Sequence, residues 1–106
     1  MALAHANDAN FSEKTARGVT LVDFWASWCG PCQMFGPIFE ATSNKITDVS
    51  FLKFEIDETN RRIPTQYGIR SIPSVLAFKD GELAEARTGV MDQETLESWI
   101  LEIKKR

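Results

Sequence analysis

The sequence predicts an α/β domain in which one mixed β-sheet carries helices on both of its faces. Over the first two thirds of the chain, β-prone segments alternate with segments of helical periodicity, which implies parallel strands joined by crossover helices. An Asp80-Gly81 pair then joins two further β-prone segments as a hairpin, which must add antiparallel strands. With 106 residues and no visible repeat or linker, the chain is expected to form a single domain over residues 1–106.

The first half of the chain predicts two strands and two helices. Residues 3–6 could form a short edge strand, and the polar side chains of residues 7–10 can cap a short helix. Residues 19–26 are almost continuously apolar and β-prone, which is typical of a central strand buried on both faces. A helix then runs to about Ile46, and Pro37 inside it predicts a kink because proline removes one backbone donor.

The second half adds three strands and two helices. Residues 51–57 indicate a strand, after which Asn60 can cap a short helix. The hairpin strands are expected over residues 74–78 and 83–88. The last helix starts near Asp92. Its buried stripe is expected to consist of Leu96, Trp99, Ile100 and Ile103.

The composition excludes several classes of function. Hydrophobic residues at 43% and charged residues at 25% are typical of a soluble globular protein. The net charge is −3 and the only basic block is residues 104–106, so nothing favours a nucleic acid or a membrane surface as partner. The amino terminus lacks the basic region and apolar run of a signal peptide, and no apolar run approaches the roughly 20 residues that cross a bilayer. We therefore expect a cytoplasmic protein.

Both cysteines of the chain lie in the segment Trp28-Cys29-Gly30-Pro31-Cys32, which is the strongest indication of function. Thiols at positions i and i+3 share a face at the start of a helix, so they can form a disulfide and reopen with little backbone movement. A cross-link around so short a loop removes little chain entropy and would stabilise the fold poorly. The pair is therefore expected to exchange electrons and protons with other disulfides.

Two other interpretations of the cysteines are a structural zinc site and an inert structural disulfide. A structural zinc site needs about four ligands, and outside the pair the chain offers only His5, in a segment without ligand spacing. An inert structural disulfide would gain little from such a tight loop. Redox exchange is favoured over both, and no metal is expected.

Several segments together form a recognisable set in register: Val22 to Cys32, Pro37, Lys53, Asp57, Tyr67 to Ser74, Phe78 to Gly81 and Gly89. Through these residues the chain resembles the thioredoxin family, from about residue 3 to the carboxyl terminus. The resemblance implies a five-stranded mixed sheet flanked by four helices. It also implies a protein-disulfide reductase with no bound cofactor beyond the Cys29–Cys32 disulfide, and the chain has no G-x-G-x-x-G fingerprint.

The reaction implied by the resemblance assigns different roles to the two thiols. Cys29, at the amino-terminal end of a helix, should have a lowered thiol pKa and act as the nucleophile, since the thiolate is the attacking species. It would form a mixed disulfide with the substrate, which Cys32 would then resolve. Gly30 and Pro31 between the cysteines are typical of the family's reductants, so we expect a reductase.

Asp23 is an acid in the middle of an apolar strand, where an unpaired carboxylate is costly and should find a partner or keep its proton. One interpretation is a structural ion pair with Lys53 on the neighbouring strand. The resemblance implies a second role, in which Asp23 relays a proton to or from Cys32 through water. The two roles are compatible.

The resemblance also implies a substrate-binding surface around Cys29. Pro73 would follow a cis peptide bond and pack against the disulfide, leaving the backbone of Ile72 free to pair with an extended substrate strand. Trp28 should be partly exposed, and Trp25 should pack near the active-site loop. We define the docking patch as the residues expected to form a flat apolar surface here: Trp28, Gly30, Pro31, Ile72, Gly89 and Val90.

The partners that the resemblance implies are thioredoxin reductase, which draws on NADPH, and proteins with disulfides, such as peroxidases and ribonucleotide reductase. A monomer is expected. Within the same class, the alternative is an electron donor dedicated to one partner. From a different class, the alternative is a non-redox binding subunit that uses the docking patch to stabilise another protein.

Overall fold

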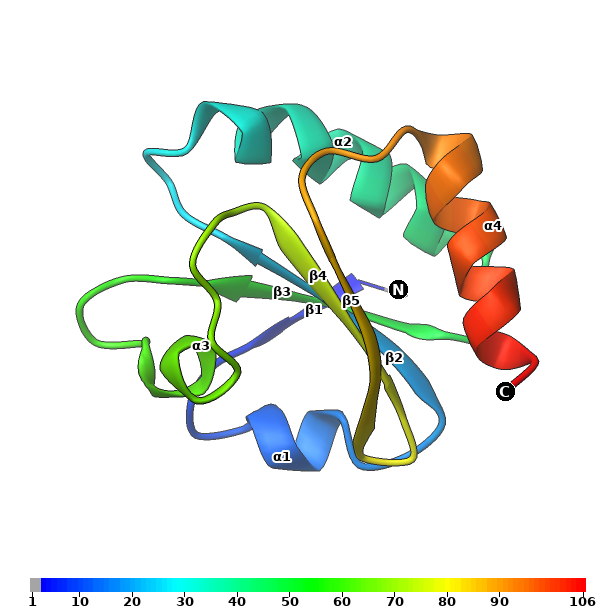
Figure 1. Ribbon diagram of the computed structural model, residues 1–106, viewed down its shortest axis with the longest axis horizontal. Helices are drawn as coiled ribbons and strands as arrows, with labels where there is room; N and C mark the ends of the chain where they lie inside the picture. Colours follow the sequence, from blue (N-terminus) through cyan, green and yellow to red (C-terminus); the bar gives the residue numbers. More distant parts are fainter. Residues whose placement is uncertain (1–2) are drawn as a thin grey trace.

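The computed structural model describes residues 3–106 as five strands and four helices (Figure 1). The strands are β1 (Leu3–Ala6), β2 (Val19–Trp25), β3 (Ser50–Glu55), β4 (Ser74–Lys79) and β5 (Glu82–Thr88). The helices are α1 (Phe11–Lys14), α2 (Gly30–Lys45), α3 (Arg62–Gln66) and α4 (Gln93–Lys104). Within residues 3–106, no helix combines the length and the apolar character that crossing a membrane requires.

The strands form one mixed sheet in the order β1-β3-β2-β4-β5. The β1–β3 and β2–β3 pairs are parallel, whereas β2–β4 and β4–β5 are antiparallel. Helices α2 and α4 lie on one side of the sheet and α1 and α3 on the other (Figure 1). The predicted fold class, a five-stranded mixed sheet flanked by four helices, is confirmed.

Side-chain alternation along β2 explains why this strand is apolar almost throughout. Leu21 belongs to the core beneath α2 and α4, whereas Val22 and Phe24 belong to the core beneath α1 and α3. Because helices cover both faces of the strand, the side chains that point to either face are buried, and a polar side chain there would lose its contact with water. The stripe predicted for α4 is confirmed as buried: Leu96, Trp99, Ile100 and Ile103.

The hairpin between β4 and β5 turns through Asp80 and Gly81 alone, so its strands extend one residue closer to the turn than predicted. Both residues have positive φ, 51° for Asp80 and 87° for Gly81, as a tight two-residue turn requires. The Asp80 carboxylate accepts a hydrogen bond of 2.9 Å from the Gly18 N–H, and Gly18 O accepts one of 2.9 Å from the Asp80 N–H. These bonds fix the turn against the segment that leads into β2.

The prediction that Asn60 caps α3 is wrong. The Asp8 carboxylate, which lies 54 and 55 residues earlier in the chain, accepts hydrogen bonds from the Arg62 and Ile63 N–H groups at 2.9 and 2.8 Å. Asn60 instead donates to Glu55 O at 2.7 Å and accepts from the Asp8 N–H at 2.8 Å. Asn60 therefore holds Asp8 in place, and Asp8 satisfies the free N–H groups at the start of α3.

Replacing Asp8 with alanine should lower the free energy of unfolding by about 1 kcal/mol, because two N–H groups of α3 lose their acceptor. Burial alone would raise the pKa of the Asp8 carboxyl, but the hydrogen bonds from Ile63 and Arg62 outweigh it, so that pKa is lowered. The contribution of Asp8 is therefore present above its ordinary value of 3.8 and is lost as the pH falls through the lowered pKa. Urea unfolding at pH 7 measures the effect. Asp8→Asn keeps one oxygen acceptor for the N–H groups of α3 and should lower the free energy of unfolding by less than Asp8→Ala. Equal decreases in the two variants would contradict this role of Asp8.

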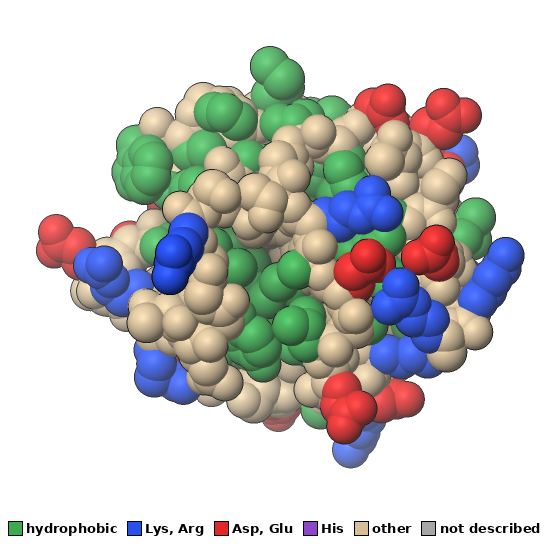
Figure 2. Space-filling view, in the orientation of Figure 1, with side chains coloured by type: hydrophobic (Ala, Val, Ile, Leu, Met, Phe, Trp, Pro, Cys, Tyr) green, Lys and Arg blue, Asp and Glu red, His purple; other side chains and the backbone are tan. Residues whose placement is uncertain are grey.

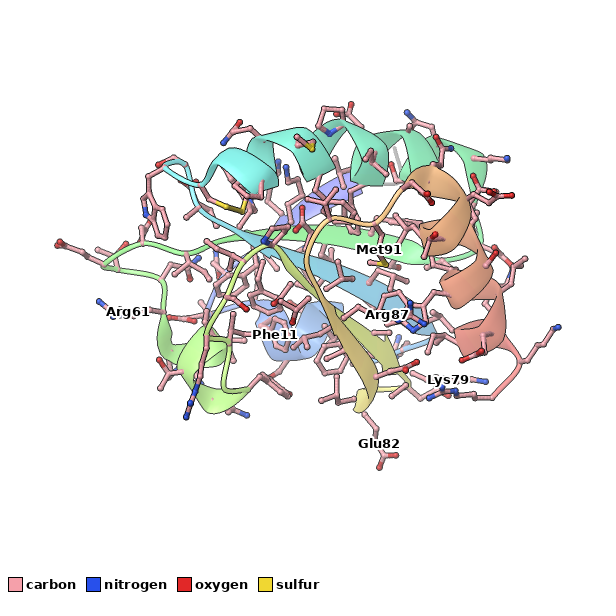
Figure 3. The ribbon with its side chains drawn as sticks, turned by 45° about the horizontal axis from the view of Figure 1, so that its top comes forward. Phe11, Arg61, Lys79, Glu82, Arg87 and Met91 are labelled. Atoms are coloured by element: carbon pink, nitrogen blue, oxygen red, sulfur yellow. A yellow bond between two sulfur atoms is a disulfide. The ribbon has the colours of Figure 1, made fainter. Side chains whose placement is uncertain are left out.

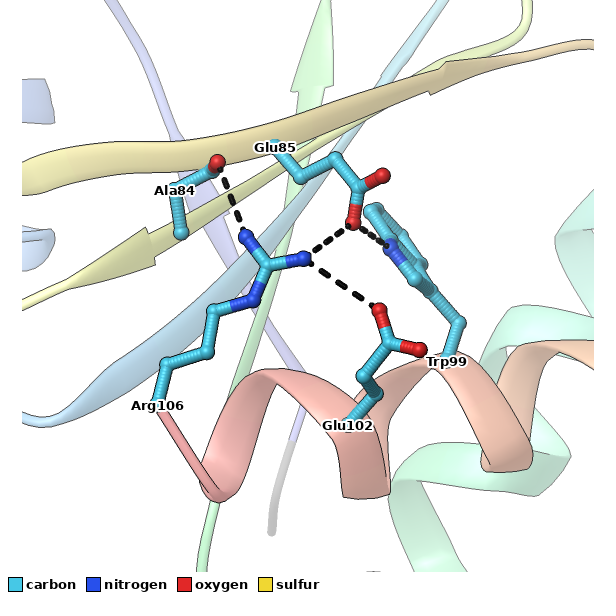
Figure 4. Close-up of polar contacts among 5 residues, drawn as sticks. All are labelled: Ala84, Glu85, Trp99, Glu102 and Arg106. Atoms are coloured by element: carbon cyan, nitrogen blue, oxygen red, sulfur yellow. Dashed lines mark hydrogen bonds and ion pairs between the residues drawn. The ribbon is translucent and has the colours of Figure 1, made fainter.

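The carboxyl-terminal end of α4 is joined to β5 by a polar cluster (Figure 4). Glu85 accepts a hydrogen bond of 2.7 Å from the Trp99 indole N–H and forms an ion pair of 3.1 Å with Arg106. The Arg106 guanidinium also pairs with Glu102 at 3.2 Å and donates to Ala84 O at 3.2 Å. The cluster orients the last helix relative to the edge strand, on the part of the molecule away from the cysteines.

Candidate active site

The cysteine pair lies where β2 ends and α2 begins. Cys29 and Cys32 are joined by a disulfide, with their Cα atoms 5.3 Å apart, and the bond appears in yellow near the start of α2 in Figure 3. Cys29 is the N-cap of α2, and its sulfur accepts a hydrogen bond of 3.2 Å from the Cys32 N–H. Pro31 lies in the first turn, where a missing N–H costs nothing. The backbone thus presents the positive end of the helix to the Cys29 sulfur.

Both cysteines are largely buried in this disulfide form. Cys29 is 5% exposed and Cys32 is 3% exposed, so the two residues differ little in their access to solvent in this form. The pair packs with Ala26, Trp25 and Ile72 in a small cluster of its own. Trp25 thus packs near the active-site loop, as expected.

The Ile72–Pro73 peptide bond is cis, as the family resemblance implied. Ile72 is half-buried against the cysteines, and its carbonyl oxygen lies 3.8 Å from the Cys29 sulfur. Gly89 joins the same loop, because its N–H donates to Pro73 O at 2.8 Å. Segments before β4 and after β5 therefore meet beside Cys29.

The docking patch contains strongly exposed apolar side chains, and Figure 2 shows hydrophobic side chains gathered over the start of α2. Trp28 is 78% exposed, more than the partial exposure predicted, and Val90 is 40% exposed. Gly30 and Pro31 are also exposed, whereas Ile72 and Gly89 are half-buried.

Sequence reasoning missed two features around the docking patch. Met34 is 67% exposed on α2, and its position three residues after Pro31 could have indicated it. A groove of about 390 Å³ runs beside Trp28, between the β2–α2 loop and the segment from Ile56 to Arg61, and Figure 3 shows Arg61 at the outer side of that segment. No local pattern indicated the groove, because it forms between loops about 30 residues apart in the chain.

Asp23 is buried in the sheet, with 1% of its surface exposed, and neither carboxylate oxygen has a hydrogen-bond partner. Burial raises the pKa of Asp23 from its ordinary value of 3.8 to about 7, and the positive charge of Lys53 only partly offsets this.

The expected direct ion pair between Asp23 and Lys53 is absent from the described residues, although the two occupy paired positions on β2 and β3. The Lys53 ammonium lies instead over the Trp25 ring, 4.6 Å from its centroid. Both oxygens of the Asp23 carboxylate remain without a partner.

Comparisons with known proteins agree with this geometry. The thioredoxin family model matches residues 2–102. The chain belongs to the thioredoxin family. Thioredoxin from Bacillus subtilis (strain 168) is 41% identical over 101 residues, covering 94% of this chain and 96% of that protein. Thioredoxin from Rickettsia bellii (strain RML369-C) is 43% identical over 100 residues, covering 92% and 94%.

Solved thioredoxin structures share the fold. The crystal structure of Malassezia sympodialis thioredoxin (Mala s 13) superposes with a TM-score of 0.83 at 33% identity, covering 96% of this chain and 90% of that one. A mutant thioredoxin from Halobacterium salinarum NRC-1 gives a TM-score of 0.84 at 34% identity, covering 92% and 87%. Membership of the thioredoxin family, together with the Cys29–Cys32 pair, identifies the chain as a thiol–disulfide oxidoreductase.

Proposed function

We propose that this thioredoxin-family protein reduces disulfides of other proteins, with Cys29 as the nucleophile and Cys32 as the resolving thiol. The Cys29 thiolate attacks one substrate sulfur, the substrate S–S bond breaks, and the departing sulfur takes a proton. The Cys32 thiol then loses its proton and attacks the Cys29 sulfur, which releases the second substrate thiol. Two electrons and two protons pass to the substrate, and the protein keeps the disulfide.

The observation that carries this proposal is the position of Cys29 as the N-cap of α2, within disulfide distance of Cys32. Free N–H groups at a helix start stabilise negative charge, which supports a Cys29 thiolate in the reduced protein. The Cys32 N–H already donates to this sulfur. Gly30 and Pro31 provide no ionisable side chain between the cysteines, which fits a reductant.

Asp23 is proposed to accept a proton from Cys32, or return one to it, through water. A buried carboxyl with a pKa of about 7 can both gain and lose a proton near neutral pH, which suits general acid–base work. Lys53 is proposed to keep that pKa from rising further, since its charge favours the ionised carboxylate.

The docking patch is proposed to bind an extended segment of the substrate, with the Ile72 backbone pairing to it. Pro73 and Gly89 hold this loop beside Cys29, and Val90 and Trp28 provide exposed apolar contacts. Apolar contacts suit a reductant that accepts many different protein disulfides.

Trp28→Ala should raise KM for a protein disulfide roughly tenfold, because a large exposed aromatic contact is lost. Reaction with a small aromatic disulfide should change less than about twofold, since it needs little docking surface. Steady-state kinetics with insulin and with 5,5′-dithiobis(2-nitrobenzoate) measure both. Leu101→Ala, an exposed apolar residue on α4, is the matched control. An equal loss on both substrates would contradict a docking role for Trp28.

The proposed electron source is a thioredoxin reductase that draws on NADPH, and the proposed substrates are disulfide-containing proteins such as peroxidases and ribonucleotide reductase. The protein is proposed to act in the cytoplasm as a monomer with one domain over residues 1–106, without a cofactor beyond its own disulfide. Residues 3–106 contain no group of three or more His, Cys, Asp or Glu side chains placed to hold a metal ion.

The decisive experiment is reduction of insulin by the full chain, driven first by dithiothreitol and then by NADPH with a thioredoxin reductase. We expect catalytic insulin precipitation in the first assay and stoichiometric NADPH oxidation in the second. Absence of activity with both reductants would overturn the proposal. Substrate trapping with Cys32→Ser separates a general reductant, which retains many partners, from a donor dedicated to one.

The exposed apolar side chains of Trp28, Met34 and Val90 also favour a second candidate, a binding subunit without redox chemistry. If the biological role survives Cys29→Ser, the docking patch rather than the thiol carries the function.

A further inference from the structure

The Lys53 ammonium has two neighbouring groups that attract a cation, the Asp23 carboxylate and the Trp25 ring, and it lies against the ring. Asp23 and Lys53 are paired across β2 and β3, and Trp25 follows Asp23 by two residues on the same face of β2. The carboxylate is the stronger partner for a cation, yet the ammonium lies 4.6 Å from the centroid of the Trp25 ring and forms no ion pair with Asp23 within 4.0 Å.

We propose that Trp25 is a positioning residue that holds the Lys53 ammonium away from the Asp23 carboxyl. The ring is half-buried among the cysteines and Ile72, so its contact with the ammonium is partly removed from water and correspondingly strong. Packing rather than hydrogen bonding fixes the ring, because the indole N–H is buried without a partner.

Helix α2 closes the other side of this cation site. A Cβ atom at Gly36 would lie 3.4 Å from the Lys53 nitrogen, so the ammonium lies close to the backbone of α2. The absence of a side chain at position 36 leaves room for it there. The ammonium is therefore held between the Trp25 ring and α2, while both oxygens of Asp23 remain without a partner.

Among the described residues, Lys53 is the charged group whose field lowers the pKa of Asp23. On β4 the residue paired with Asp23 is Val75. The buried residues of α2 carry no charge and include one titratable group, the Cys32 thiol of the reduced form. The distance between the ammonium and the carboxyl thus sets how far Lys53 offsets the effect of burial on the pKa of Asp23, and Trp25 sets that distance.

The role of Trp25 rests on the proposed function in one respect, namely that Asp23 exchanges a proton with Cys32 during catalysis. The test reads the carboxyl directly, in the oxidised protein and without substrate. A failed test would leave insulin reduction intact, and a failed insulin assay would leave the pKa result intact.

The measurement is the pKa of Asp23, followed by the carboxyl ¹³C chemical shift during a pH titration. In Trp25→Leu the ammonium loses its aromatic partner and moves to the carboxylate, so the pKa of Asp23 should fall by about one unit or more. Trp25→Phe keeps an aromatic face and loses only an N–H that has no partner, so most of the wild-type pKa should be retained.

The same substitution in a Lys53→Met background separates positioning from simple opening of the site. If Trp25 acts through Lys53, Trp25→Leu should produce no further fall in the pKa of Asp23 when the ammonium is missing. Water entering a looser site would lower that pKa in both backgrounds, and this result would overturn the proposal. Arg87→Met removes the cation that lies 5.3 Å from the Trp99 ring and is the matched control, for which no change is expected.

A measurement on the unmodified protein keeps the proposal testable if Trp25→Leu does not fold. The ε-methylene protons of Lys53 should resonate upfield of those of the other lysines, because the ammonium to which this methylene is bonded lies over the Trp25 ring. A Lys53 resonance at the position of the other lysines would overturn the proposal.

Discussion

In the Cys29→Ser variant, the rate of insulin reduction is expected to fall to the rate of the uncatalysed reaction. A serine hydroxyl does not attack disulfides at neutral pH, and the remaining Cys32 has no intramolecular partner with which to form the product disulfide. The rate of insulin precipitation with dithiothreitol, compared with a protein-free sample, measures the loss. Residual catalysis above about 1% of the unmodified protein would show that Cys29 is not the nucleophile.

Cys32→Ser should behave differently, although it also ends turnover. Cys29 can still attack, but the mixed disulfide cannot be resolved, so a covalent adduct with the substrate should accumulate. Mass spectrometry before and after addition of dithiothreitol detects it. An adduct that forms in Cys29→Ser and not in Cys32→Ser would reverse the two assigned roles.

Asp23→Asn is expected to change how stability depends on pH. The raised pKa means that native Asp23 holds a proton between pH 3.8 and about 7, where the unfolded chain has released it. The stabilisation from this proton is fully present below pH 3.8 and is lost as the pH rises through about 7. About three pKa units at 1.36 kcal/mol each correspond to roughly 4 kcal/mol. Relative to the unmodified protein, Asp23→Asn should therefore gain up to roughly 4 kcal/mol between pH 4 and pH 8.

Urea unfolding of the oxidised proteins at several pH values measures this difference. Thr20→Val is the matched control, because it removes another unpartnered buried polar group from β2 that carries no titratable proton. Its effect on stability should be the same at pH 4 and pH 8. A stability difference for Asp23→Asn that is likewise constant with pH would show that the carboxyl titrates normally.

The sequence could predict the features of this fold that local patterns decide. An almost continuous apolar run predicted β2 because both faces of that strand are covered. The Asp80-Gly81 pair predicted the hairpin because few other residues adopt positive φ so easily. The location of the cysteine pair at the start of α2 followed from spacing and helix geometry.

Other features depend on contacts between distant segments and have no local signal. The cap of α3 comes from Asp8, more than 50 residues away, whereas Asn60 had the expected sequence position. Sequence reasoning placed Lys53 beside Asp23 correctly through strand pairing. It could not rank the carboxylate against the Trp25 ring, because that outcome depends on how the three side chains are oriented.

The contact between Asp8 and α3 has a practical consequence for protein engineering. Helix α3 leads into the loop with Ile72 and Pro73, so its anchor in the amino-terminal segment also supports the surface that we propose binds substrate. Affinity tags or truncations that disturb residues 7 and 8 would loosen this loop without altering any residue that touches a thiol. Fusions intended to preserve partner choice are therefore better attached at a different point of the chain.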